Sequence, residues 1–194
     1  MQVTIERATI KPIDVISQAA GICYGKTDAS YKRVKHCYEH GHMSVFEHAH
    51  VSLKIEGISR ACMAQLTRHR HVSFCVESQR YTRYDLSGND WYVIPPSFDG
   101  DQAYFRKCMR EAAGHYTICV NGGMKPEDAR YLLPGATKTN LVMTCNVREL
   151  FHVLDMRTDG AAQWEIRQLM SKIIGVLKEC SEQWWDLMLL REGK

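Results

Sequence analysis

The sequence predicts an α+β fold, and three observations lead to this prediction. Polar and apolar residues alternate over His48–Ile55 (HAHVSLKI), as they do in a strand with one buried face. Apolar residues recur at helical spacing over Asp101–Val120 and again after Ala161. The expected strands and helices do not alternate strictly along the chain, which argues against the repeating strand–helix units of α/β folds.

Length and composition indicate one globular domain over residues 1–194. Hydrophobic residues make up 45% and charged residues 24% of the chain, ordinary values for a folded protein. The net charge of +3 disfavours the strongly basic class of nucleic-acid binders. The first residues do not form a signal peptide, and no apolar run is long enough for a membrane helix. Together with eight irregularly spaced cysteines, expected to be free thiols, this predicts a cytoplasmic protein.

In the first part of the chain, Val3–Ile10 has moderate strand character. A helix is expected from about Ile13, and a polar helix from Ser30 to His40, ending at a glycine. Ser59 is a candidate N-cap for a further short helix.

In the second part, Trp91–Ile94 is expected to be a short strand that two prolines terminate. Pro126 begins a short helix that ends before Pro134-Gly135, and Thr139–Thr144 is expected to be a strand. A long amphipathic helix from about Ala161 then has an apolar stripe formed by Trp164, Leu169, Met170, Ile173, Ile174 and Leu177. The chain ends with another helical stretch that holds Trp184, Trp185, Leu187 and Met188.

The stretch from Gln65 to Tyr84 has the densest polar signal. It holds four arginines within sixteen positions: Arg68, Arg70, Arg80 and Arg83. Arginine binds phosphate oxygens in a bidentate manner, so the stretch could bind a phosphate or pyrophosphate. If residues 68–70 are extended, both arginines face one side and His69 the other. A solvated basic loop is the alternative, but the apolar segments on either side favour a binding site.

Five of the nine histidines lie in one region: His42, His48, His50, His69 and His71. A His48-x-His50 pair on a strand would be compatible with metal binding, but the H-E-x-x-H arrangement is absent. We therefore expect no metal site, and histidines that serve as polar and stacking groups around an anionic pocket.

Ser78 and Cys75 are the two candidate nucleophiles, and neither has a supporting motif. The G-x-S-x-G pattern is missing, and a lone cysteine is more often a small packed apolar residue. Glu165 and Arg167 are expected to form an ordinary polar face of the long helix. The Rossmann and P-loop glycine patterns are also missing, so a nucleotide would have to bind without them.

Several blocks together resemble one known family. Arg68-His69-Arg70, followed after seven residues by Ser78 and then by Arg80-Tyr81, is similar to the signature of the flavin-dependent thymidylate synthases. GHMSVFEH, ARYLLP, TCNVREL and the block formed by Arg157 and AQWEIR occur in the order expected for that family. The resemblance covers roughly residues 15–170.

The resemblance implies both an architecture and an activity. The architecture is a central antiparallel twisted sheet with surrounding helices, in a homotetramer whose active sites are shared between subunits. The activity is the reductive methylation of dUMP to dTMP, in which methylenetetrahydrofolate gives the carbon and NADPH gives electrons through FAD. The flavin transfers hydride and the protein supplies no nucleophile. Neither a membrane nor a nucleic-acid partner is expected.

The resemblance also assigns residues by position. Those matching FAD contacts are Ser44, Arg68, His69, Arg70, Asn146, Arg148 and His152. Those matching dUMP contacts are Gln65, Arg68, Glu77, Ser78, Gln79, Arg80, Arg130 and Arg157. The catalytic set is Arg157, Ser78 and His42, of which His42 matches a histidine near the flavin and folate. Arg80 and Arg130 can hold the phosphate, and Arg157 can stabilise negative charge developing on the uracil ring.

The chain departs from the family pattern at four positions. Many members have Asn at Cys75 and Glu or Gln at Val76, whereas the carboxylate here is Glu77. Ala161 replaces a histidine of some members, and Cys23 stands where others have Ser.

Two other functions are compatible with parts of the pattern. A nucleic-acid-binding module could use Tyr81, Tyr84 and Trp91 to stack on bases. A histidine-metal hydrolase would contain stoichiometric zinc and no flavin, whereas a yellow purified protein would favour the synthase.

Overall fold

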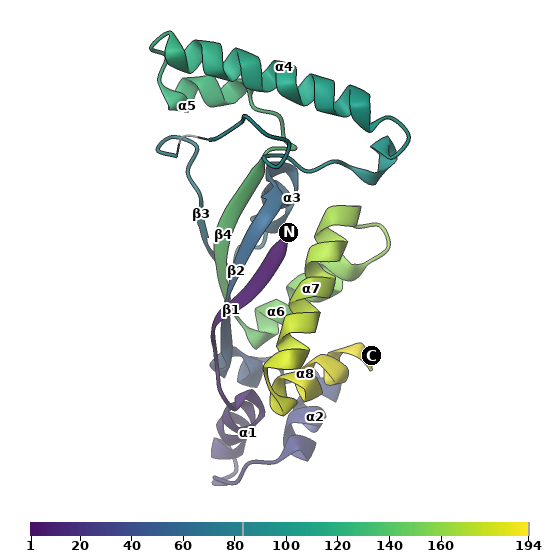
Figure 1. Ribbon diagram of the computed structural model, residues 1–194. Coiled ribbons are helices and arrows are strands. Elements are labelled where there is room, and N and C mark those ends of the chain that lie inside the picture. Colours follow the sequence, from purple (N-terminus) through teal and green to yellow (C-terminus); the bar gives the residue numbers. More distant parts are fainter. Residues whose placement is uncertain (83, 194) are drawn as a thin grey trace. The chain divides into compact units, whose positions relative to one another are not determined.

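The computed structural model describes residues 1–82 and 84–193 (Figure 1). Contacts between Cα atoms divide the chain into two compact units. The first unit comprises Met1–Ile55, Thr67–Phe74 and Val142–Lys194, and the second comprises Glu56–Leu66 and Cys75–Leu141. The single domain over 1–194 stays a prediction.

The chain forms eight α-helices, four strands and three short 3₁₀ helices over the described residues. In order they are β1 (Gln2–Ala8), α1 (Pro12–Ile22), α2 (Tyr31–Glu39), η1 (Met43–His48), β2 (His50–Ser59), α3 (Arg60–Leu66), β3 (Ser73–Val76), η2 (Pro96–Phe98), α4 (Gln102–Asn121), α5 (Pro126–Ala129), η3 (Arg130–Leu132), β4 (Lys138–Asn146), α6 (Val147–Thr158), α7 (Trp164–Cys180) and α8 (Glu182–Glu192).

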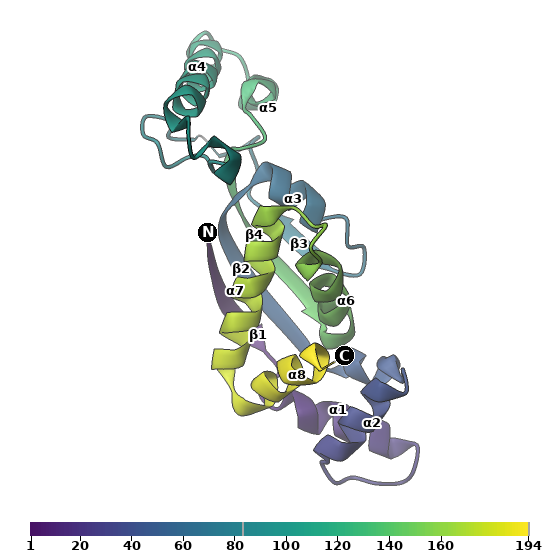
Figure 2. The same cartoon turned by 90° about the vertical axis from the view of Figure 1, so that its right-hand side faces the viewer.

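The four strands form one antiparallel sheet in the order β1-β2-β4-β3, which confirms the α+β prediction. Burial alternates along the two central strands, since Val51, Leu53 and Ile55 of β2 are buried while the residues between them are not. On the opposite face, the hydroxyls of Ser52 and Thr144 bond to each other across β2 and β4 at 2.8 Å. Helices α6 and α7 lie on one side of the sheet in both views, and α7 contacts β1 (Figure 2).

Aromatic side chains fill the core of the first unit. The rings of Tyr38, Phe46 and Phe151 pack against one another with centroids 5.6–5.9 Å apart, which joins α2, η1 and α6. Trp184 of α8 is fully buried, and its indole N–H donates to the carbonyl of Thr9 at 3.0 Å. This core holds α6 in place beneath the sheet.

The second unit has its own small core. Trp91, Tyr92, Met109 and Ala113 are buried together, so the segment after residue 90 packs against α4. Helix α4 also contacts α5 and η3. These contacts support the short segment that carries Glu127 and Arg130.

Two expected strands differ from the structure. Trp91–Ile94 is not a strand, because only Tyr92 pairs with Thr137, and the prolines at 95 and 96 have no N–H with which to extend the ladder. His48 ends η1 and β2 begins only at His50, so the two histidines do not share a strand.

Two expected local features also differ. The stretch from Arg68 to Arg70 forms a turn and is not extended, although burial still alternates, with His69 buried between two exposed arginines. Glu165 is buried, so it is not part of an exposed polar face with Arg167. Trp164 beside it is half-buried.

The sequence interpretation missed two elements, β3 and α6. Strand β3 is short and has one exposed edge. Helix α6 follows β4 without a loop, so no turn residues in the sequence mark where the strand ends and the helix begins. Among the described residues, no helix is long and apolar enough to cross a membrane.

Candidate active site

Helix α6 begins at a capped turn that directs its first residues toward a cavity. The side-chain oxygen of Asn146 accepts a hydrogen bond from the backbone N–H of Glu149 at 2.9 Å, the normal N-cap arrangement. The N–H of Val147 donates to the carbonyl of Ala49 at 2.9 Å, which fixes this turn to the start of β2. Because its oxygen is committed to the helix, the amide NH₂ of Asn146 is the group that can contact a ligand.

A polar cavity of about 570 Å³ lies at this helix end. Its lining residues all belong to the first unit and are Glu47, His71, Asn146, Arg148, Glu149 and His152. The guanidinium of Arg148 bonds to the carboxylate of Glu47 at 2.6 Å. A helix N-terminus carries partial positive charge, so together with the arginine it attracts an anionic group, whereas the carboxylates of Glu47 and Glu149 in the same lining oppose one.

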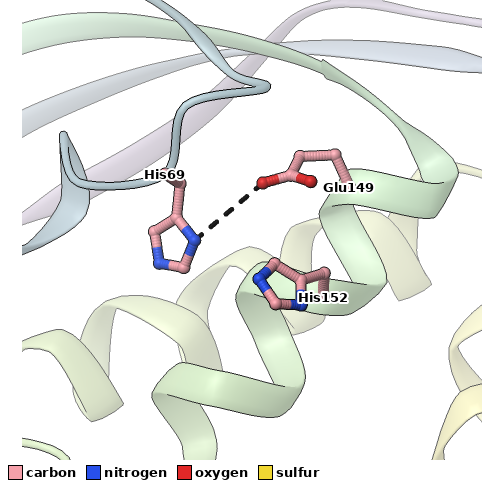
Figure 3. Close-up of side chains that lie close together, drawn as sticks. All are labelled: His69, Glu149 and His152. Atoms are coloured by element: carbon pink, nitrogen blue, oxygen red, sulfur yellow. Dashed lines mark ion pairs between the residues drawn. The ribbon is translucent and has the colours of Figure 1, made fainter.

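His69, Glu149 and His152 lie close together (Figure 3). Glu149 and His152 belong to the lining of the cavity. Nδ1 of His69 is 3.9 Å from a carboxylate oxygen of Glu149, and the His69 and His152 rings are edge-to-face with centroids 5.7 Å apart. His69 comes from the turn after α3, whereas the other two are three residues apart on α6. Only 7% of His69 and 9% of Glu149 is exposed.

His69 is a neutral imidazole with a defined tautomer. Burial first, and then the positive charge of Arg157, lower the pKa of His69 from 6.5 to about 4. Nε of Arg157 donates to Nε2 of His69 at 2.9 Å. Since Nε2 accepts this bond, the proton of the neutral ring is on Nδ1, which faces Glu149.

The same three residues could in principle ligate a metal ion, since their ligand atoms lie within 4.8 Å of one another. Two features oppose this. Nε2 of His69 is already used by Arg157, and a guanidinium directly behind the ring repels a divalent cation.

In the second unit, Glu77 and Ser78 lie in a segment held by β4. The amide of Asn140 donates to the Glu77 carboxylate at 2.8 Å, and the Glu77 N–H donates to the Asn140 carbonyl at 2.9 Å. The hydroxyl oxygen of Ser78 accepts from the backbone N–H of Arg80 at 3.2 Å. Ser78 is thus oriented by a local turn, with its hydroxyl hydrogen able to donate to a ligand.

Glu127 brings two of the expected substrate-binding arginines together. Nε of Arg80 bonds to the Glu127 carboxylate at 3.1 Å, and Nε of Arg130 donates to the Glu127 backbone carbonyl at 3.0 Å. Both contacts use Nε, so neither involves the terminal guanidinium nitrogens through which arginine binds phosphate.

Gln79 supplies an unpaired polar group in the same unit. The residue is 6% exposed, and its side-chain nitrogen has no hydrogen-bond partner among the described residues. A buried unpaired donor is costly, so this nitrogen is able to donate to a ligand or a water molecule.

The structure groups the expected residues by unit. All expected FAD residues belong to the first unit, and all expected dUMP residues belong to the second except Arg68 and Arg157. Of the FAD set, Asn146, Arg148 and His152 line the cavity, and His69 adjoins it through the contact with His152.

Besides His69, five expected residues of the first unit are not among the cavity-lining residues that the structure describes: His42, Ser44, Arg68, Arg70 and Arg157. The His42 ring instead lies 6.4 Å from those of His36 and His40, at the end of α2. Arg83 of the basic stretch lies outside the described residues.

The sequence interpretation missed three acidic or amide residues that orient the site: Glu149, Glu127 and Asn140. A signal for Glu149 exists, because Asn146-x-x-Glu149 matches the spacing of a capping box and would have located α6. Glu127 and Asn140 act through partners far away in the chain and leave no local pattern.

Comparisons with known proteins point to one family. Residues 4–181 match the family model described as thymidylate synthase complementing protein. A flavin-dependent thymidylate synthase of Haloarcula marismortui is 34% identical, over 90% of this chain and 89% of its own. One of Pyrococcus furiosus is 38% identical, over 90% and 78%. A crystal structure of the Helicobacter pylori flavin-dependent thymidylate synthase, complexed with FAD and dUMP, is similar in fold, with a TM-score of 0.78, 24% identity and coverage of 91% and 94%.

Because His69 is neutral in the folded chain, we expect it to affect how the free energy of unfolding depends on pH. Because its folded pKa lies below 6.5, the unfolded chain takes up this proton at higher pH than the folded chain does. His69 therefore lowers the free energy of unfolding as pH falls from 6.5 through 4. When urea unfolding is measured as the pH falls over this range, we expect the free energy of unfolding to decrease less in His69→Gln than in the wild type. His71→Gln, exposed in the same turn, is the control and should follow the wild type. Equal slopes for the wild type and His69→Gln would contradict the assignment.

Proposed function

This chain belongs to the flavin-dependent thymidylate synthase family, and on that premise we propose that it converts dUMP to dTMP in an FAD-dependent reaction. The main support is the family match over residues 4–181, combined with a polar cavity at the start of α6 that three of the expected FAD residues line. Methylenetetrahydrofolate as the carbon donor and NADPH as the electron donor are parts of the proposal.

The residues around the cavity are suited to FAD. Arg148 and the N-terminus of α6 favour an anionic group, and Asn146 offers an amide donor. His152 offers a ring nitrogen at the same wall. Bound FAD would supply the hydride, and the protein would supply orientation and electrostatics.

The residues of the second unit are suited to a nucleoside monophosphate. Arg80 and Arg130, joined through Glu127, would hold the phosphate. The unpaired amide of Gln79 would donate to the substrate. Glu77, held by Asn140, is proposed as a further contact.

Arg157 is proposed to face the uracil ring. A guanidinium stays charged at any physiological pH, so it can stabilise negative charge on the ring but cannot act as a base. Ser78 would orient and polarise the substrate without attacking it. His42 keeps its proposed place near the flavin and folate as a prediction.

The proposed assembly is a homotetramer with shared active sites. Exposed apolar side chains of the single chain, such as Ile22, Tyr24 and Tyr131, support contacts with other subunits. Mass determination by light scattering tests the assembly. A cytoplasmic location, and the lack of a nucleic-acid partner, stay predictions from the sequence.

The first test is an absorbance scan of the purified protein, followed by NADPH oxidation with and without dUMP. We expect flavin bands near roughly 375 and 450 nm and oxidation that dUMP stimulates. FAD is added and the assay repeated if the protein is colourless. A protein that still binds no flavin and does not respond to dUMP would contradict the proposed function.

Arg157→Ala is expected to retain FAD and lose turnover by about 10²–10³-fold, because the positive charge at the uracil is removed. Flavin content is read from absorbance and turnover from dTMP formation. Arg167→Ala, exposed on α7, is the matched control and should keep wild-type turnover. Near-normal turnover of Arg157→Ala would remove this residue from the catalytic set.

Cys75→Ala is expected to keep full activity, because the proposed reaction uses no protein nucleophile. Cys75 is exposed on β3, so the substitution leaves the core intact. Complete loss of dTMP formation in a folded, flavin-loaded variant would instead make Cys75 a nucleophile.

A further inference from the structure

Glu149 is a nearly buried carboxylate to which neither the sequence motifs nor the proposed reaction gives a role. We propose that Glu149 is a positioning residue, which acts through His69 to orient the guanidinium of Arg157 toward the pyrimidine of dUMP. The inference rests on the proposed function, because it assumes that Arg157 faces the substrate. It follows from three contacts within the first unit, of which Figure 3 shows the one between His69 and Glu149.

The first step is the direction of the Arg157–His69 hydrogen bond. A guanidinium nitrogen can only donate, so Nε2 of His69 must accept the 2.9 Å bond through its lone pair. A protonated ring would place an N–H against the Arg157 N–H and break this bond. The bond therefore requires a neutral His69 with its hydrogen on Nδ1.

The second step is the electrostatic effect of Glu149. Its carboxylate oxygen lies 3.9 Å from Nδ1, so it attracts the N–H that the first step requires. The other tautomer would place a lone pair toward the carboxylate and an N–H toward Arg157, and both contacts would be repulsive. Glu149 thus favours the one tautomer that can accept from Arg157.

The third step is the rigidity of Glu149 itself. Its backbone N–H is bonded to the Asn146 side chain, which places it in the first turn of α6. Arg157 lies two turns further along the same helix, so α6 carries both Glu149 and Arg157, which His69 connects.

The consequence concerns the guanidinium plane. A bond at Nε sets the orientation of the whole planar group without using its terminal nitrogens. A flexible arginine side chain loses conformational entropy when it binds a ligand. Because the bond to His69 orders Arg157 before the substrate arrives, less entropy is lost on binding.

A double-mutant cycle on flavin-loaded protein tests the inference. The measurement is the equilibrium dissociation constant of dUMP by dialysis, with flavin content read from absorbance. We expect Glu149→Leu to raise this constant about tenfold, and to have little further effect when Arg157 is already Ala. Glu149→Gln, which keeps a partially negative oxygen that attracts the Nδ1 hydrogen, should recover most of the affinity. A merely structural role would give additive effects.

Asp155→Asn is the matched control. Asp155 is on the same helix and pairs with Arg191 at 2.8 Å. This substitution also removes one negative charge from α6, but it should leave the dissociation constant of dUMP unchanged.

A spectroscopic measurement reads the tautomer directly. In solid-state NMR of flavin-loaded protein with ¹⁵N-labelled histidine, the His69 signal is identified as the one lost in His69→Gln. We expect a protonated Nδ1 in the wild type and in Glu149→Gln, and a mixture of tautomers in Glu149→Leu. If Glu149→Leu fails to fold or to load flavin, Glu149→Gln and the wild-type spectrum still decide the matter, because a protonated Nε2 in either overturns the inference.

The possible failures are distinguishable. A wild type that does not bind dUMP overturns the proposed function and the inference with it, before any variant is made. A wild type that binds dUMP, with additive effects of Glu149→Leu and Arg157→Ala, overturns the inference alone. Stoichiometric divalent metal in the purified protein, lost on substitution of Glu149, would assign the three residues to a metal site instead.

Discussion

The candidate site of the first unit depends on the hydrogen bond that starts α6. The Asn146 side chain accepts the Glu149 N–H at 2.9 Å and turns the end of β4 directly into a helix. Residues three to four positions apart then share one side of that helix, so Arg148, Glu149 and His152 reach the same cavity. Phe151, buried against Tyr38 and Phe46, anchors a neighbouring side of α6 in the core.

A buried neutral histidine connects two oppositely charged side chains in the first unit. His69 stands between the guanidinium of Arg157 and the carboxylate of Glu149, and it can accept from one and face the other with an N–H. A charged ring would lose the bond to Arg157, and burial alone already opposes that charge. A reaction that proceeds without a protein nucleophile depends on such fixed charges, because the reacting group is the cofactor.

Acidic residues orient the arginines throughout both units. The Glu47 carboxylate bonds to Arg148 in the first unit. In the second unit, the Glu127 carboxylate bonds to Arg80, and the Glu127 backbone carbonyl accepts from Arg130. Each partner holds a guanidinium in place and partly offsets its charge. An anionic ligand would therefore meet arginines that are already ordered, which reduces the entropy lost on binding.

The sequence by itself determined the family, the α+β class and most of the helices, because these depend on contiguous blocks and on local periodicity. It also placed the candidate residues, although their roles toward FAD and dUMP stay predictions. Only the tertiary structure decided that His69 is neutral, and that Glu149 and Glu127 organise the arginines. The reason is physical: the partners of His69–Arg157 and Arg80–Glu127 are 88 and 47 residues apart, and contacts over such separations leave no periodic signal in one sequence.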